Sequence, residues 1–350
     1  MDQLSLKMDR RQVADIFVGK SLQQEMAQYI KQLAASSVIY ITRESLESLL
    51  REYLKPNQED VLTFPSGENQ KSLASVTQIV KFLLAKKADK NALIVSFGGG
   101  STSDLVGFAA AVYKRGIKVI YIPTTLLAMV DASIGGKNGV NFEGTKNLLG
   151  AIYNPQAIFV DTDLMKGLPR QEFLSGLGEL AKIAICLDRK LFDLLQQPFD
   201  ENMEAIILRG IENKLRQVKM DPYDNSADRQ MLNFGHSLGH ALESVSGFRL
   251  RHGLAVAIGC NFASFISKQR GYITESEYQK IVRFIEKLGL PRTTDFEVKP
   301  TMKFMKLDKK KLDSDSLNFV LIQSIGGGIV EPLSFAEIEH YLVHFRSQNP

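Results

Sequence analysis

The sequence is poor in the features that mark secreted and membrane-bound proteins. It has only two cysteines among 350 residues, Cys186 and Cys260, which give no disulfide framework and indicate a reducing compartment. No apolar run reaches the roughly 18–20 residues that a membrane-spanning helix needs. Residues 1–12 lack the apolar core of a secretory signal. We therefore expect a cytoplasmic protein without a membrane partner.

The excess of positive charge is also small. The formal net charge is +4, and the composition of 44% hydrophobic and 23% charged residues is ordinary for a globular protein. Such a charge fits an anionic small molecule as well as nucleic acid, so it gives no reason to expect nucleic-acid binding. The length allows two domains.

The first half of the chain alternates short β-rich runs with helical runs. The expected strands are 36–42, 61–65, 92–100 and 118–125, and the expected helices are 44–54, 72–88 and 104–116. This alternation is typical of an α/β domain with a parallel sheet and helices on both faces.

From about residue 168 onward, amphipathic helical patterns dominate the chain. We therefore predict a Rossmann-like α/β domain over 1–168 and a mostly α-helical domain over 169–350. Pockets favour domain interfaces and the carboxyl ends of parallel strands. The active site is accordingly expected in the cleft between the two domains.

A glycine-rich turn follows the strand expected at 92–100. The stretch IVSFGGGSTSD lacks the spacing GxGxxG, so the common dinucleotide fingerprint is absent. Two interpretations are open. The glycines form either a tight strand-to-helix turn with Ser101 or Ser103 near the cap, or a phosphate site at a helix N-terminus.

Residues 122–150 combine glycines with charged and polar side chains, including Asp131, Lys137, Lys146 and Asn147. We expect a long loop here, and its apolar content argues against disorder. A surface loop with solvated lysines is the plainer alternative. Lysines carried among glycines suit phosphate or carboxylate groups, so we favour an anion site.

Three segments offer metal ligands, although the motif HExxH is absent. His236 and His240 stand four residues apart in LNFGHSLGHALE and would share a helix face. Glu179, with Lys182 three residues on, lies in an otherwise small and apolar helix, where a charge is costly unless it is paired or bound to a metal. His252 precedes another apolar helix. Two histidines and a carboxylate would suit catalytic zinc, whereas each histidine alone could be an ordinary buried or surface residue.

Several long motifs, in this order, resemble the 3-dehydroquinate synthases of the sugar phosphate cyclase family. They are GGGSTSDLVGF, RGIKVIYIPTTLLAMVDASIGGKNGVN, TKNLLGAIYNPQA, SGLGELAK, LNFGHSLGHALE and RHGLAVAIG. The resemblance runs from about residue 36 to the DKK near 308 and implies an NAD- and metal-dependent carbon–oxygen lyase.

The resemblance also implies a role for individual residues. NAD would contact Glu68, Lys71, Gly99, Gly100, Ser101, Asp104, Thr124, Thr125, Leu127 and Lys146. Zinc, or cobalt with the same ligands, would be bound by Glu179, His236 and His252. Catalytic roles would fall to Asp131, Lys137, Lys182, Arg229, Asn233 and His240. The substrate would contact Arg115, Lys146, Asn147, Lys214 and one of Lys309 and Lys310.

The reaction implied is the conversion of 3-deoxy-D-arabino-heptulosonate 7-phosphate to 3-dehydroquinate and phosphate, a step of aromatic amino acid biosynthesis. NAD would oxidise the substrate transiently, phosphate would leave, and reduction and an intramolecular aldol step would follow. Arg115 would reach the phosphate of a substrate in a neighbouring subunit, which implies a homodimer.

The chain departs from the family pattern in places, which keeps other functions open. Arg43 stands where an acid often contacts the adenosine ribose, and DPYDNSADRQ and SGFRLRHG are similar to the 2-epi-5-epi-valiolone synthases. Asn233 and His240 favour 3-dehydroquinate synthase over that branch. A metal-dependent alcohol or polyol dehydrogenase would not need the cluster of lysines. An inactive dinucleotide-binding scaffold would not keep all three zinc ligands.

Overall fold

The chain separates into two compact units, and each is described by itself. A computed structural model describes residues 1–8, 11–221, 227–307 and 315–348, without the side chains of 7, 8, 11–13 and 227–229. Unit 1 is Met1–Leu168, and unit 2 is Pro169–Pro350. Among the residues described, no helix has the length and apolar character to span a membrane.

Unit 1 is built on a seven-stranded sheet in the order β1-β2-β9-β6-β5-β3-β4. The strands are β1 (Asp2–Met8), β2 (Arg11–Gly19), β3 (Val38–Arg43), β4 (Val61–Phe64), β5 (Leu93–Gly98), β6 (Lys118–Pro123) and β9 (Ala157–Asp161). All neighbours pair in parallel except the edge pair β1 and β2, so the predicted parallel sheet is confirmed, with one antiparallel edge strand.

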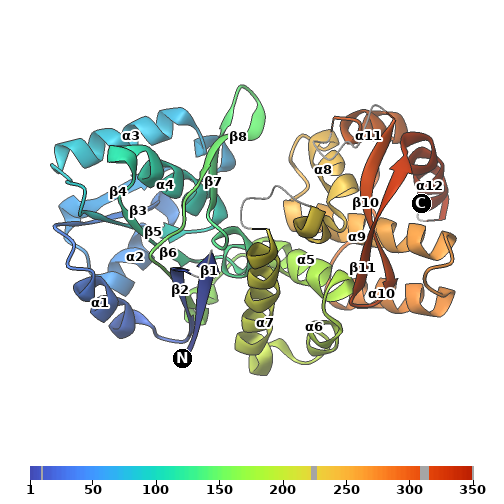
Figure 1. Ribbon diagram of the computed structural model, residues 1–350, viewed down its shortest axis with the longest axis horizontal. Coiled ribbons are helices and arrows are strands. Elements are labelled where there is room, and N and C mark those ends of the chain that lie inside the picture. Colours follow the sequence, from blue (N-terminus) through green and yellow to red (C-terminus); the bar gives the residue numbers. More distant parts are fainter. Residues whose placement is uncertain (9–10, 222–226, 308–314, 349–350) are drawn as a thin grey trace. The chain divides into compact units, whose positions relative to one another are not determined.

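Helices cover both faces of this sheet. Two of them, α3 (Leu73–Ala85) and α4 (Gly100–Val112), lie on one face. The other two, α1 (Gln23–Gln32) and α2 (Glu47–Leu54), lie on the opposite face (Figure 1). Every residue of β5 is buried as a result. This explains why β5 is a continuous apolar run rather than an alternating one.

The loop expected over 122–150 contains regular structure instead. A π-helical turn spans Ala128–Ala132, and an antiparallel hairpin follows, made of β7 (Lys137–Phe142) and β8 (Thr145–Ile152). A Cβ atom on Gly150 would lie only 2.4 Å from Asn138 O on the facing strand. The glycines that indicated a loop therefore permit a close pair of strands.

Unit 2 is mostly helical, as predicted, but it also carries an unexpected β-hairpin. Its helices are α5 (Arg170–Cys186), α6 (Arg189–Leu194), α7 (Phe199–Met220), α8 (His236–Val245), α9 (His252–Gln269), α10 (Glu275–Lys287), α11 (Val298–Met305) and α12 (Phe335–Gln348). The hairpin consists of β10 (Ser316–Ser324) and β11 (Gly327–Ser334). α9 is buried along most of its length and packs against α5 and α8.

Helices α5 and α9 approach each other unusually closely. A Cβ atom on Gly253 would lie 1.8 Å from Ser175 O, and one on Gly178 would lie 2.0 Å from Gly253 O. The N–H of Gly253 also donates to Ser175 Oγ at 3.1 Å. Neither position has room for a side chain, so glycine is required on both helices.

We predict that Gly253→Ala destabilises unit 2. In an uncrowded helix this change would stabilise by about 1 kcal/mol, because alanine has the higher helix propensity. Here the contact with Ser175 O should reverse the sign, at a cost of about 1–3 kcal/mol. Denaturant unfolding measures the difference, and a variant at least as stable as the wild type would contradict the close crossing. The partly exposed α8 residue Ser244, changed to alanine, is the control for helix propensity.

Candidate functional site

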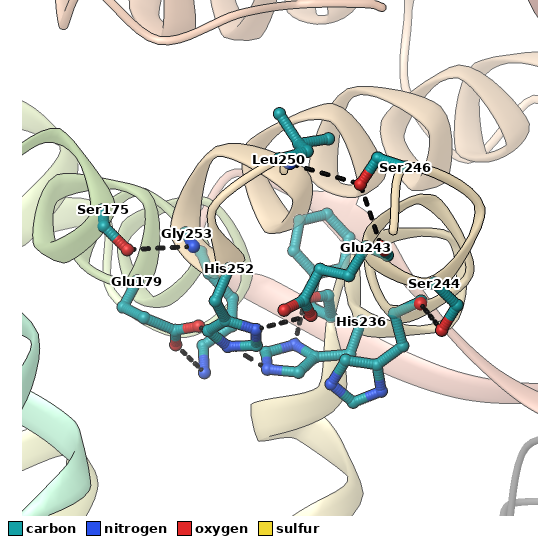
Figure 2. Close-up of polar contacts among 12 residues, drawn as sticks. Ser175, Glu179, His236, Glu243, Ser244, Ser246, Leu250, His252 and Gly253 are labelled. Atoms are coloured by element: carbon teal, nitrogen blue, oxygen red, sulfur yellow. Dashed lines mark hydrogen bonds and ion pairs between the residues drawn. The ribbon is translucent and has the colours of Figure 1, made fainter. Parts of the chain in front are cut away.

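Three helices of unit 2 bring two histidines to one carboxylate. Glu179 lies in the middle of α5, and His236 and His252 are the first residues of α8 and α9. Glu179 Oε1 lies 3.0 Å from His252 Nε2 and 3.5 Å from His236 Nε2. Figure 2 shows these side chains converging beside the contact of Ser175 with Gly253.

The spacing of these atoms fits a shared metal ion. Metal–ligand bonds of about 2.0–2.2 Å at a tetrahedral angle place two ligand atoms about 3.4 Å apart. Both oxygens of Glu179 are buried, and neither accepts a hydrogen bond of good geometry from any residue that the structure describes. Burying a carboxylate that accepts no hydrogen bond is costly unless a cation compensates its negative charge. The donor set therefore suits a divalent metal.

Lys182 neutralises the other side of the carboxylate. Its Nζ lies 2.5 Å from Glu179 Oε2, and both side chains are almost fully buried. Burial would raise the pKa of Glu179, but Lys182 and His252 outweigh it and hold that pKa well below its usual range. Glu179 is thus ionised, with one oxygen toward lysine and the other toward the two imidazoles. The predicted pairing of Glu179 and Lys182 on one helix side agrees with this geometry.

His240 lies in the same cluster, one turn along α8 from His236. Its ring centroid is 5.1 Å from that of His236 and 5.7 Å from that of His252. One ligand atom from each of the three histidines lies within 4.8 Å of the others, so the geometry also permits a three-histidine set. His240 is exposed, however, whereas His236 is only 9% exposed.

Glu243 is a member of this cluster that the sequence did not single out. Its Oε2 lies 2.9 Å from His252 Nδ1, on the far side of the ring from Glu179 (Figure 2). Burial would lower the pKa of His252, but the carboxylates of Glu179 and Glu243 raise it to about 10. A signal was available, because Glu243 follows His236 by seven residues and so lies two helical turns away on the same face.

In unit 1, the glycine turn lies at the point in the sheet where the order of successive strands reverses. The chain passes from β3 outward to β4, and from β5 the opposite way to β6. The connecting helices α2 and α4 lie on opposite faces of the sheet (Figure 1). Ligands of such sheets bind at this switch point, outside the carboxyl ends of the strands. Gly98 ends β5, and α4 begins at Gly100.

The turn is tight because the chain packs against itself there. A Cβ atom on Gly98 would lie 2.7 Å from Thr102 Oγ1, and one on Gly100 would lie 2.8 Å from Ala132 Cβ. The strand-to-helix turn is thus present, and its 13-residue helix presents an N-terminus suited to an anion. This geometry fits the pyrophosphate of a dinucleotide.

A buried lysine links several residues beside this turn. Lys71 Nζ lies 2.5 Å from Asp104 Oδ2 and also contacts Asn147 Oδ1. Burial raises the pKa of Asp104 to about 6, although Lys71 opposes that shift. Glu68 lies nearby and accepts a hydrogen bond from Asn141 Nδ2 at 3.2 Å. The fold thus brings Lys71 and Asp104, which were predicted to contact NAD, next to Asn147, which was predicted to contact the substrate.

Arg43, the departure from the family pattern, lies at the switch point. Its guanidinium donates to Thr102 Oγ1 at 3.1 Å, to Pro65 O at 3.1 Å and to Ser101 Oγ at 3.2 Å. Only 6% of the residue is exposed. Arg43 therefore holds the first turn of α4.

Most of the other predicted residues lie in unit 1. Thr124 and Thr125 follow β6 beside the glycine turn, Leu127 precedes the π-helical turn, and Asp131 lies within it. Lys137 begins β7, Lys146 and Asn147 lie on β8, and Arg115 ends a 3-10 turn after α4 with a φ of 63°. Lys214 lies on α7, and Asn233 ends a 3-10 segment before α8. The side chain of Arg229, and Lys309 and Lys310, lie outside the described residues.

Family models cover both units of the chain. The model of the 3-dehydroquinate synthase N-terminal domain matches residues 61–175, and that of the C-terminal domain matches residues 176–311. A curated 3-dehydroquinate synthase from Campylobacter concisus is 37% identical over 82% of this chain and 83% of its own length. The chain belongs to the 3-dehydroquinate synthase family.

Other members of the 3-dehydroquinate synthase family show the same extent of similarity. The proteins of that name from Sulfurovum sp. and Streptococcus pneumoniae are 38% and 33% identical. The matches cover 87% and 94% of this chain, and 87% and 96% of theirs. Membership of the 3-dehydroquinate synthase family indicates an enzyme of the lyase class.

Solved structures of related cyclases share the fold. A 2-deoxy-scyllo-inosose synthase, solved with carbaglucose-6-phosphate, NAD+ and Co2+, has a TM-score of 0.84 and 25% identity over 97% of this chain and 98% of its own. The 2-epi-5-epi-valiolone synthase of Streptomyces hygroscopicus, solved with NAD+ and Zn2+, has a TM-score of 0.84 and 26% identity over 96% and 97%. A probable glycerol dehydrogenase from Sinorhizobium meliloti, at 15% identity, shares the fold alone (TM-score 0.62; 96% of each chain).

The cluster leaves two candidate ligand sets, and metal content separates them. We predict that His236→Ala removes most of the bound zinc, because the site loses one of three protein ligands. His240→Ala should leave the zinc content near that of the wild type. Elemental analysis of dialysed protein measures both, and equal loss in the two variants would favour the three-histidine set.

Proposed function

We propose that the chain is a 3-dehydroquinate synthase, which converts 3-deoxy-D-arabino-heptulosonate 7-phosphate to 3-dehydroquinate and phosphate in aromatic amino acid biosynthesis. The observation that carries the proposal is the approach of Glu179 Oε1 to His252 and His236, at 3.0 and 3.5 Å. It occurs in a chain whose relatives of that name are 33–38% identical. A divalent metal beside two imidazoles and one carboxylate keeps a position open for substrate.

Unit 1 is the proposed NAD-binding domain, and unit 2 the proposed metal- and substrate-binding domain. The glycine turn and the cluster around Lys71 and Asp104 support the first assignment. The cluster around Glu179 supports the second, with His236 and His252 as the other ligands. When bound, NAD would accept and return a hydride, and zinc or cobalt would stabilise negative charge on substrate oxygens.

The chain's own cations would bind the anionic substrate. Its phosphate and carboxylate need compensating charge, which Lys137, Lys146 and Lys214 would supply, with one of Lys309 and Lys310. Such a cluster has no purpose for a neutral polyol. We therefore favour a sugar phosphate cyclase over a dehydrogenase.

Polar residues beside the proposed metal site would orient the substrate and move protons. His240 is exposed at the edge of the cluster, where it can contact substrate while His236 and His252 hold the metal. Lys182 would keep Glu179 ionised through its contact with Oε2, and it would also donate a hydrogen bond to the substrate. Asn233, three residues before His236 in the sequence, is another proposed substrate contact, as are Asp131, Asn147 and Arg229.

The enzyme should release phosphate from the heptulosonate and not from the substrate of the sister branch. Purified protein with NAD and zinc should release inorganic phosphate from 3-deoxy-D-arabino-heptulosonate 7-phosphate. Sedoheptulose 7-phosphate should give no release, and omission of NAD is the control for uncatalysed loss. Release from sedoheptulose 7-phosphate alone would move the assignment to the 2-epi-5-epi-valiolone synthases. The solved structure of one of them has a TM-score of 0.84 to this chain.

We further propose a cytoplasmic homodimer in which Arg115 binds the substrate phosphate in the neighbouring subunit. A mixture of inactive Arg115→Ala and inactive Lys146→Ala protein should then recover about a quarter of wild-type activity, because half of randomly mixed dimers are hybrids with one intact site each. Phosphate release measures the recovery. No recovery after demonstrated subunit exchange would show that both residues serve the same subunit.

A further inference from the structure

The imidazole of His252 lies between two carboxylates. Its Nε2 is 3.0 Å from Glu179 Oε1, and its Nδ1 is 2.9 Å from Glu243 Oε2. Only 8% of the Glu243 side chain is exposed. A carboxylate is strongly solvated in water, so its burial at this position requires a compensating partner, and His252 supplies one.

We infer that Glu243 is a positioning residue that orients His252 and strengthens it as a metal ligand, an inference that rests on the proposed function of the cluster. A carboxylate at Nδ1 holds the proton on that nitrogen. When a metal replaces the proton on Nε2, the lone pair of that nitrogen is directed at the position beside Glu179 Oε1. Hydrogen bonding of this kind fixes the tautomer and the ring plane, and it raises the basicity of the bound nitrogen.

The two histidines of the proposed site are held differently. The Nδ1 of His236 faces the backbone carbonyl of Phe234 at 3.2 Å, so a neutral acceptor fixes that ring. His252 instead meets a full negative charge. Together Glu179 and Glu243 supply two negative charges around the metal position, and Lys182 neutralises part of the first from the opposite side.

The fold keeps Glu243 in place from several directions. Its carbonyl oxygen accepts a hydrogen bond from Ser246 Oγ at 2.9 Å (Figure 2). It also accepts one from Phe248 N at 2.8 Å, and the two bonds fix the end of α8. Near the middle of α8, a Cβ atom on Gly239 would lie 3.2 Å from Ala255 of α9. The two helices are therefore close enough for Glu243 to reach the first residue of α9.

The inference is tested by metal affinity in the absence of NAD and substrate. Zinc binding to the metal-free protein is measured by competition with a chelating dye. We expect Glu243→Gln to bind zinc about 10–100-fold more weakly than the wild type, as the loss of such a hydrogen-bonded partner usually does. Glu243→Asp, which keeps the charge on a shorter side chain, should recover part of the loss.

Ser244→Ala is the matched control, because Ser244 is the next residue of α8 and is only partly buried, and its described side-chain hydrogen bond goes to the carbonyl of His240. Its zinc affinity should equal that of the wild type. The visible absorption of the cobalt-loaded protein gives a second measurement. We expect altered bands in Glu243→Gln, because the orientation of one ligand changes.

Two outcomes would overturn the inference. The first is wild-type zinc affinity with an unchanged cobalt spectrum in Glu243→Gln, and the second is a wild-type protein that binds no zinc. If Glu243→Gln does not fold, the zinc affinity of Glu243→Asp decides in the same way. A wild type that binds zinc but releases no phosphate from the heptulosonate would contradict the proposed function and leave the role of Glu243 intact.

Discussion

Unit 2 depends on the close crossing of α5 and α9. At that crossing the backbone of Gly253 lies so near Ser175 that a Cβ atom would be 1.8 Å from its carbonyl oxygen. Each glycine at the crossing is adjacent in sequence to a charged or ligating residue, Glu179 after Gly178 and His252 before Gly253. The absence of two side chains thus brings a carboxylate and an imidazole to 3.0 Å. A larger residue would separate the helices and the functional groups together.

This crossing also requires charges to be buried. Glu179 is fully buried, and its charge is balanced by Lys182 on one side and by imidazole nitrogens on the other. Glu243 adds a second buried carboxylate on the far side of His252. Removing one partner from such a group leaves an uncompensated charge in a medium of low polarity, which usually costs about 3–5 kcal/mol. The cluster is therefore a constraint on folding as well as a candidate metal site.

Much of the architecture could be predicted from periodicity, because strands and helices have distinct apolar patterns. The parallel sheet and the helical second half follow from this. The hairpin of β7 and β8 could not, since Gly139 and Gly150 give the same local signal whether they make a flexible loop or let two strands approach. Glu243 was missed for a related reason. Its seven-residue spacing from His236 indicates the same helix face, but an acid near the end of an amphipathic helix is ordinary on a surface, and the spacing does not show that Glu243 is buried.

The sequence by itself determined the family, through long motifs in a fixed order, and the alternation of elements, through residue spacing. Only the tertiary structure decided which side chains meet. Lys71 contacts Asp104 and Asn147, which are 33 and 76 residues away along the chain, and His252 meets Glu243 from a different helix. Local propensity acts over a few residues, whereas these contacts are set by how sheet and helices pack. Their geometry therefore exists only once the core has formed.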